Sequence, residues 1–164
     1  MIDYLCHVCG KTFPVDTIRY KCECGSPLSL TQSEMCFPIE EIASRDNNLW
    51  RYREALPIVN ETSIVSLNEG MTPLVSTSSS MCDHRLKLDF VFPTGSYKDR
   101  GASILLSKAR EAGIREVVED SSGNAGAAIA AYSAKAGIDC TIYCPSTTSA
   151  GKLTQISMYG AKLK

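Results

Sequence analysis

The chain has 164 residues, a formal net charge of −1 and eight cysteines. This length suffices for one hydrophobic core with a small satellite segment. The balanced charge, without a basic block, gives no support to nucleic-acid binding, and no apolar run is long enough to cross a bilayer. The first residues also lack the basic and apolar regions of a signal peptide, so we expect a cytoplasmic protein.

The first 35 residues contain two close pairs of cysteines, each followed by a glycine: Cys6 and Cys9, then Cys22 and Cys24. Four thiolates in two pairs are a common ligand set of structural zinc. We therefore predict a zinc-ribbon-like segment over residues 1–35, with these four cysteines as ligands. Cys36 is a spare ligand candidate, and His7 is expected to be solvated. The alternative is a set of free surface cysteines.

Residues 36–60 are expected to form a helical connector, with a helix over 39–56 that is interrupted at the turn-favouring residues 46–48. The following segments alternate between turn formers and short apolar runs, and the run at 85–91 has the apolar–polar alternation of a half-buried strand. Strands are predicted at 64–67, 74–75 and 85–91, with a surface connection at 76–84.

From residue 97 onward, helical and strand patterns alternate. Helices are predicted at 97–112, 124–136 and 149–159, and strands at 116–119, 138–144 and from 161. This alternation is typical of a parallel sheet with helices on both faces, in which the loops after the strands line the ligand crevice. In the first of these helices, the residues expected to be buried are Gly101, Ile104, Leu105 and Ala109.

The sequence PTGSYKDRG at 93–101 places Lys98 in the first turn of a helix, with Ser96 and Asp99 spaced as a capping box. An amine at the positive end of a helix dipole is poorly placed to remain a tightly solvated ammonium, and such a lysine can act as a Schiff-base amine. From spacing alone, a solvated surface lysine remains the alternative.

A second motif, SSGNAGAA at 121–128, joins a strand to a helix. The small side chains of Ser121, Ser122 and Gly123 would let an anion approach the free amides at the start of that helix. The alternative is a Ser-Gly-Asn turn that begins a tightly packed, alanine-rich helix.

Together, these two motifs resemble the paired signature of the pyridoxal-phosphate enzymes of the tryptophan synthase β family, which have fold type II. The resemblance is greatest to the threonine synthase branch, in which some members also begin with a four-cysteine segment. It implies a three-layer α/β fold and a lyase that converts O-phospho-L-homoserine and water to L-threonine and phosphate. It also implies pyridoxal phosphate attached to Lys98, Asn124 bonded to the cofactor's ring oxygen, and the substrate carboxylate held at Ser121, Ser122, Gly123 and Asn124.

Enzymes of this family hold the cofactor between two α/β domains, so we expect residues 61–164 to be only the first part of the catalytic domain. The cup for the cofactor's phosphate and the partner of its pyridine nitrogen are not identifiable, and we expect these 164 residues alone to be inactive. Arg100 and Lys152 are candidates for binding the substrate's phosphate. The expected partners are an amino-acid substrate and, as one option, a second copy of the chain, but neither nucleic acid nor a membrane.

Two other functions remain open at this point. A dehydratase or cysteine synthase of the same fold would use the same two motifs. A non-catalytic zinc-ribbon protein, which binds or regulates a partner, would use neither, although an intact Lys98 argues against it.

Overall fold

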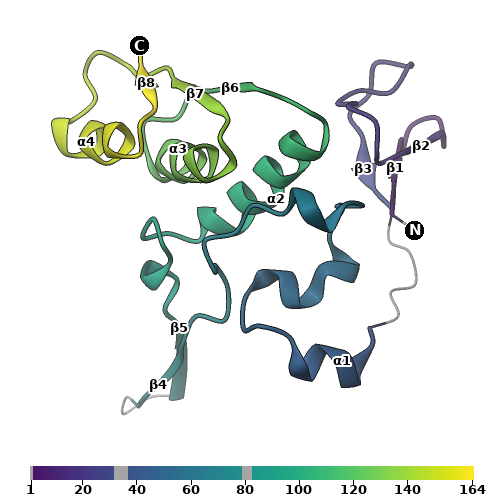
Figure 1. Ribbon diagram of the computed structural model, residues 1–164, viewed down its shortest axis with the longest axis horizontal. Coiled ribbons are helices and arrows are strands. Elements are labelled where there is room, and N and C mark those ends of the chain that lie inside the picture. Colours follow the sequence, from purple (N-terminus) through teal and green to yellow (C-terminus); the bar gives the residue numbers. More distant parts are fainter. Residues whose placement is uncertain (1, 32–36, 79–82) are drawn as a thin grey trace.

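The protein is described by a computed structural model that covers residues 2–31, 37–78 and 83–164, so the candidate ligand Cys36 lies outside the described residues. Its N-terminal segment is an antiparallel sheet of three short strands, ordered β2-β1-β3. Figure 1 shows these strands grouped to one side of the other elements. The strands are β1 (Asp3–Leu5), β2 (Thr12–Pro14) and β3 (Ser29–Leu30).

The connector is helical and interrupted, as the sequence predicts. It consists of α1 (Ile39–Ser44) and the 3-10 helices η1 (Leu49–Ala55) and η2 (Glu61–Ser63). The break is stabilised by Asn48, whose side chain accepts a hydrogen bond from the Trp50 amide and so caps η1. Trp50 is buried and fixes the connector against the larger body.

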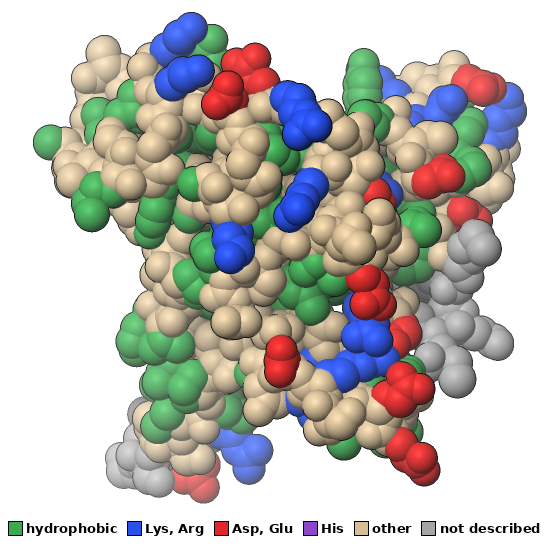
Figure 2. All heavy atoms as spheres, viewed as in Figure 1, with side chains coloured by type: hydrophobic (Ala, Val, Ile, Leu, Met, Phe, Trp, Pro, Cys, Tyr) green, Lys and Arg blue, Asp and Glu red, His purple; other side chains and the backbone are tan. Residues whose placement is uncertain are grey.

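An antiparallel hairpin follows, formed by β4 (Leu74–Ser78) and β5 (Asp83–Lys87). The predictions for this region were largely wrong: the expected surface connection is part of the hairpin, and the strand at 85–91 stops at Lys87, before η3 (Asp89–Val91). Every residue of β5 is exposed, because a two-stranded ribbon has no second layer to cover it. Figure 2 shows hydrophobic side chains gathered at the surface in this region.

The predicted alternation of helix and strand is confirmed in the remainder of the chain. The elements are α2 (Lys98–Glu111), β6 (Glu116–Glu119), α3 (Asn124–Ala136), β7 (Asp139–Ile142), α4 (Ala150–Met158) and β8 (Lys162–Leu163). The three strands form a parallel sheet in the order β6-β7-β8. Gly137 ends α3 in the left-handed conformation, as a C-capping glycine does.

The expectation of helices on both faces of this sheet does not hold among the described residues. Helices α3 and α4 pack against each other and against the same face, whereas α2 packs on α3 (Figure 1). On the opposite face Val118 is 65% exposed. The described chain therefore has three layers: the sheet, then α3 with α4, then α2.

The core lies between α2, α3 and the sheet. Residues 126–133 of α3 are all buried, and their small side chains let α2 approach closely. On α2 the buried face differs from the prediction, since Gly101 and Leu105 are exposed and Ala102, Ser103, Leu106 and Ser107 are buried with Ala109. No helix among the described residues is long and apolar enough to cross a membrane.

The serines on this face explain why no strand forms at 64–67. Val65 is buried, and its backbone is paired with α2 instead of with a neighbouring strand. Its amide donates to the Ser107 hydroxyl at 2.8 Å, and its carbonyl lies 2.7 Å from the Ser103 hydroxyl, whose single proton it shares with the Glu69 carboxylate. These side-chain partners satisfy the buried backbone groups that a sheet would otherwise satisfy.

Candidate active site

The corner that precedes α2 is held by a buried carboxylate. Asp99 accepts hydrogen bonds from the backbone amide of Thr94, at 2.9 Å, and from the Thr94 hydroxyl. The predicted capping box is therefore only partly formed: the Ser96 hydroxyl accepts from the Lys98 amide, but Asp99 caps Thr94 instead of Ser96. Burial raises the pKa of the Asp99 carboxyl, against the lowering effect of the Thr94 hydrogen bonds.

Lys98 is the first residue of α2, as the sequence predicts, but its side chain is exposed in the described chain. Its Nζ atom lies 5.1 Å from the centre of the Tyr97 ring. The enclosed crevice that we expected around this amine is thus not built by the described residues alone. The neighbouring Arg100 is engaged, because it donates to Asp89 at 3.0 Å and lies over the Phe92 ring.

The second motif forms a tight turn between β6 and α3. Gly123 is the N-cap residue of α3, and no side-chain hydrogen bond caps the helix. Ser121 and Ser122 are half-buried, and Asn124 is exposed at the helix start. Uncapped amides at the N-terminus of a 13-residue helix, flanked by small side chains, suit an anion such as a carboxylate.

Helix α4 connects the two motif loops. The side-chain amide of Gln155 donates to the backbone carbonyl of Thr94 at 2.9 Å. The next residue, Ile156, is fully buried and lies close to Gly126, in the first turn of α3 and within the second motif. Consecutive residues of one helix therefore contact both loops, which brings the Lys98 corner and the Asn124 turn to the same part of the molecule.

Sequence reasoning assigned no role to Glu69, which lies in the loop before β4. Its side chain is fully buried and accepts hydrogen bonds from residues of three separate elements. These donors are Trp50, Ser103 and Tyr132, joined by Ser66 and the Leu67 amide from the same loop. The only local signal was the pair of serines spaced one turn apart, Ser103 and Ser107, within an otherwise apolar helix face.

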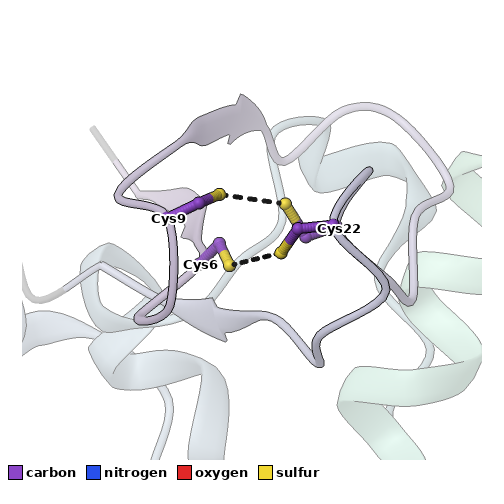
Figure 3. Close-up of side chains that lie close together, drawn as sticks. Cys6, Cys9 and Cys22 are labelled. Carbon is purple, nitrogen blue, oxygen red and sulfur yellow. Dashed lines mark hydrogen bonds between the residues drawn. The ribbon is translucent and has the colours of Figure 1, made fainter.

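The four predicted cysteine ligands do converge. Their sulfur atoms all lie within 4.8 Å of one another, with Cys6 3.6 Å from Cys24 and Cys9 3.4 Å from Cys22. Figure 3 shows the sulfur atoms of Cys6, Cys9 and Cys22 directed toward a common point. Hydrogen bonds from Ser26 lower the pKa of the Cys24 thiol to about 6. His7 is exposed, as expected.

The glycines after the two cysteine pairs form tight turns. Gly10 and Gly25 both adopt positive φ, and their amides donate to the carbonyls of Cys6 and Cys22. Of the apolar residues between the two cysteine pairs, Val15 is buried but Ile18 is 70% exposed. Ile18 instead borders an apolar cavity of about 550 Å³ between the ribbon and α2, which contains neither Lys98 nor the Asn124 turn.

Residues 65–164 match a protein-family model whose description is pyridoxal-phosphate dependent enzyme. The chain belongs to this family. The match includes both motif loops and all elements from β4 to β8, and it begins at Val65, before the loop that carries Glu69. The N-terminal cysteine segment lies outside it.

Curated relatives of this pyridoxal-phosphate family member include threonine synthases. That of Methanocaldococcus jannaschii is 40% identical, over 96% of this chain and 42% of its own length. The threonine synthase of Methanosarcina acetivorans is 34% identical over 96% of this chain and 41% of its own. The chain thus spans about two fifths of the length of these relatives, and its similarity to them includes the cysteine segment.

Solved structures of similar proteins confirm the fold of this chain. An O-ureido-L-serine synthase superposes with a TM-score of 0.53 at 30% identity, covering 57% of this chain and 32% of that one. A hydrogen sulfide-producing enzyme from Fusobacterium nucleatum gives a TM-score of 0.54 at 25% identity, covering 65% and 36%. Unlike the two threonine synthases, both leave more than a third of this chain unmatched.

Proposed function

We propose that the protein containing this chain is a threonine synthase, which converts O-phospho-L-homoserine and water to L-threonine and phosphate. One observation carries the proposal: similarity to two threonine synthases extends over 96% of the chain, including the cysteine segment outside the family model. A dehydratase or cysteine synthase would account for the two motif loops but not for that segment. A non-catalytic role is disfavoured by Lys98, which stands intact at the start of α2.

The residues present fit the cofactor at two points. Lys98 provides a primary amine on an ordered corner, and the uncapped N-terminus of α3 provides amide donors for an anion. In this proposal Lys98 attaches the cofactor, Asn124 bonds its ring oxygen, and Ser121, Ser122 and Gly123 hold the substrate carboxylate. When bound, pyridoxal phosphate supplies the electron sink for the reaction.

The chain's own groups would then position and move protons. Lys98 Nζ is the basic atom at the corner and would take up and return a proton. Asp99 fixes the Thr94 backbone and hydroxyl, and Gln155 fixes the Thr94 carbonyl, so the loop before Lys98 is held from both sides. Of the two cations considered for the substrate's phosphate, Arg100 is already paired with Asp89, whereas Lys152 is exposed in the first turn of α4.

The test uses the full-length protein. Borohydride reduction in the presence of pyridoxal phosphate, followed by peptide mass spectrometry, should locate the modified lysine at position 98. Lys98→Ala should abolish both the adduct and phosphate release from O-phospho-L-homoserine, while the control Lys135→Ala, at an exposed position in the last turn of α3, should retain both. An adduct at another lysine, or phosphate release unaffected by Lys98→Ala, would refute the assignment.

We also propose that Cys6, Cys9, Cys22 and Cys24 bind a structural zinc ion. Tetrahedral zinc with bonds of about 2.3 Å to sulfur places its ligands slightly less than 4 Å apart, close to the observed spacing. Metal analysis of the full-length protein should give one zinc per chain. Cys22→Ser should lower this content, whereas Cys144→Ser, a cysteine outside the cluster, should not; equal zinc content in both variants would contradict the site.

A further inference from the structure

Glu69 is the most heavily hydrogen-bonded buried acid among the described residues. Its Oε1 atom lies 3.0 Å from Trp50 Nε1 and 2.6 Å from Ser103 Oγ. Its Oε2 atom lies 2.8 Å from the Tyr132 hydroxyl and 2.9 Å from the Leu67 amide. The Ser66 hydroxyl is 3.2 Å from both oxygens. Every one of these groups can donate, and an ionised carboxylate can only accept.

No lysine or arginine nitrogen lies within 4.0 Å of Glu69 in the part of the chain that the structure describes. The nearby acid Asp99 adds to the cost of burying Glu69 because like charges repel. The same repulsion contributes to the raised pKa of the Asp99 carboxyl. A buried acid without a cation is unfavourable unless neutral donors compensate for the lost water. An apolar side chain here would leave the Trp50 indole, the Tyr132 hydroxyl and the Leu67 amide without their acceptor, so these groups depend on one carboxylate to hold them together.

The backbone on either side of Glu69 is fixed, which aims its side chain inward. The Glu69 carbonyl accepts from the Leu49 amide at 2.7 Å. At Gly70, which has φ +118°, an added Cβ would lie 2.5 Å from the Leu49 nitrogen. The loop is therefore pressed directly onto the start of η1, and only glycine permits this approach.

Two of the donors to Glu69 lie on the two helices that carry the proposed active-site motifs. Ser103 lies on α2 five residues after Lys98, and Tyr132 lies on α3 eight residues after Asn124. At a rise of 1.5 Å per residue, Ser103 is about 7.5 Å along α2 from Lys98, and Tyr132 is about 12 Å along α3 from Asn124. One carboxylate thus bridges two helices whose N-termini present the amine and the anion site.

We infer that Glu69 is a positioning residue, which sets the place of α3 relative to α2 and so the place of Asn124 relative to Lys98. This inference rests on the proposed function for the roles of those two residues. Glutamine at position 69 would replace one accepting oxygen with an NH₂ group among converging donors, so at least one bridge must break. Glu69 itself touches neither motif loop, and its effect on the reaction is indirect.

The experiment compares three variants of the full-length protein with the wild type. Glu69→Gln and Tyr132→Phe each weaken the bridge, whereas Tyr159→Phe removes the same hydroxyl from a tyrosine outside the network. The first two should lower kcat by about 10- to 100-fold, the usual effect of a small misplacement of reacting groups, and should shift the pH midpoint of the bound cofactor's absorbance. Tyr159→Phe should match the wild type in both measurements.

A merely structural role predicts a different result: lower melting temperatures with wild-type kcat and an unchanged absorbance midpoint. That result would overturn the inference. A second arm needs no cofactor, namely hydrogen exchange in the apoprotein of the amides at 127–133, which are hydrogen-bonded within α3. Glu69→Gln should make them exchange about tenfold faster, and exchange at the wild-type rate would overturn the inference.

The two arms separate this inference from the proposed function. If the wild type forms no adduct at Lys98, the proposed function is wrong, and the hydrogen-exchange result alone then decides whether Glu69 positions the α3 turn. If the adduct forms but neither variant changes kcat, the absorbance midpoint or exchange, the proposed function stands and the role of Glu69 is refuted.

Discussion

Replacing Gly126 with alanine tests how tightly the turn before α3 is built. A Cβ atom at this position would lie 1.9 Å from the carbonyl oxygen of Ser121, 3.1 Å from its carbonyl carbon and 3.3 Å from Ile156 Cδ1. Real Cβ atoms essentially never approach other heavy atoms to within 3.0 Å, so the Ser121 backbone or the first turn of α3 must move by more than about 1 Å.

Overpacking of this kind typically costs about 1–3 kcal/mol, and we expect the upper part of this range because the closest atoms are backbone. Alanine is favoured over glycine inside a helix by up to about 1 kcal/mol, which opposes the clash. The net loss expected for Gly126→Ala is therefore about 1–2 kcal/mol. Ser121 is one of the residues of the proposed carboxylate site, so its displacement should weaken substrate binding as well.

The assay is urea unfolding of the full-length protein, with Gly151→Ala as the matched control. Gly151 is also helical, in α4, but its added Cβ meets nothing within 4 Å. The control should leave stability unchanged or raise it by up to about 1 kcal/mol. If Gly126→Ala proves as stable as Gly151→Ala, the turn relaxes freely and the steric reasoning is wrong.

Two further predictions concern the core and the connector. Leu106→Ala should cost about 2–5 kcal/mol in urea unfolding because Leu106 is fully buried, whereas Leu105→Ala on the same helix, 51% exposed, should cost less than half as much; equal losses would contradict the observed face of α2. Arg45 donates two hydrogen bonds to Glu54, which holds the pKa of that carboxyl at about 2. Because the folded pKa is depressed, the ion pair stabilises the protein fully above about pH 4.5 and is lost as the pH falls toward 2. Glu54→Gln should therefore flatten the acid limb of a stability–pH profile measured by thermal unfolding, and an unchanged profile would refute this assignment.

Features encoded by short stretches of sequence could be predicted well. Helix α3 begins at Asn124 and ends at Ala136 as the pattern indicates, because a small-residue turn and Gly137 mark its two ends locally. The four cysteines converge because each pair is close in sequence and is followed by a glycine that turns the chain. Lys98 could be placed in the first turn of a helix for the same reason.

Features that depend on distant partners could not be predicted. Glu69 lies in a segment with the composition of a simple turn, yet three of its donors are 19, 34 and 63 residues away in the chain. The buried face of α2 was misassigned because both sides of the helix carry apolar residues. The inner side also carries Ser103 and Ser107, whose hydroxyls find their partners in Glu69 and the Val65 backbone, and these partners are distant in the sequence. The β4–β5 hairpin has the alternation of a half-buried strand without a layer to bury it.

The hydrogen bond from Gln155 to the Thr94 carbonyl also has a consequence for the order in which the protein is made. Gln155 is synthesised 61 residues after Thr94, which corresponds to several seconds on the ribosome at about 5–20 residues per second. During this interval the Lys98 corner has only its local contacts, chiefly those of Asp99. The corner therefore acquires its final restraint only once α4 has emerged and docked, so the surroundings of Lys98 are completed late in biosynthesis although the residues of the corner are translated early.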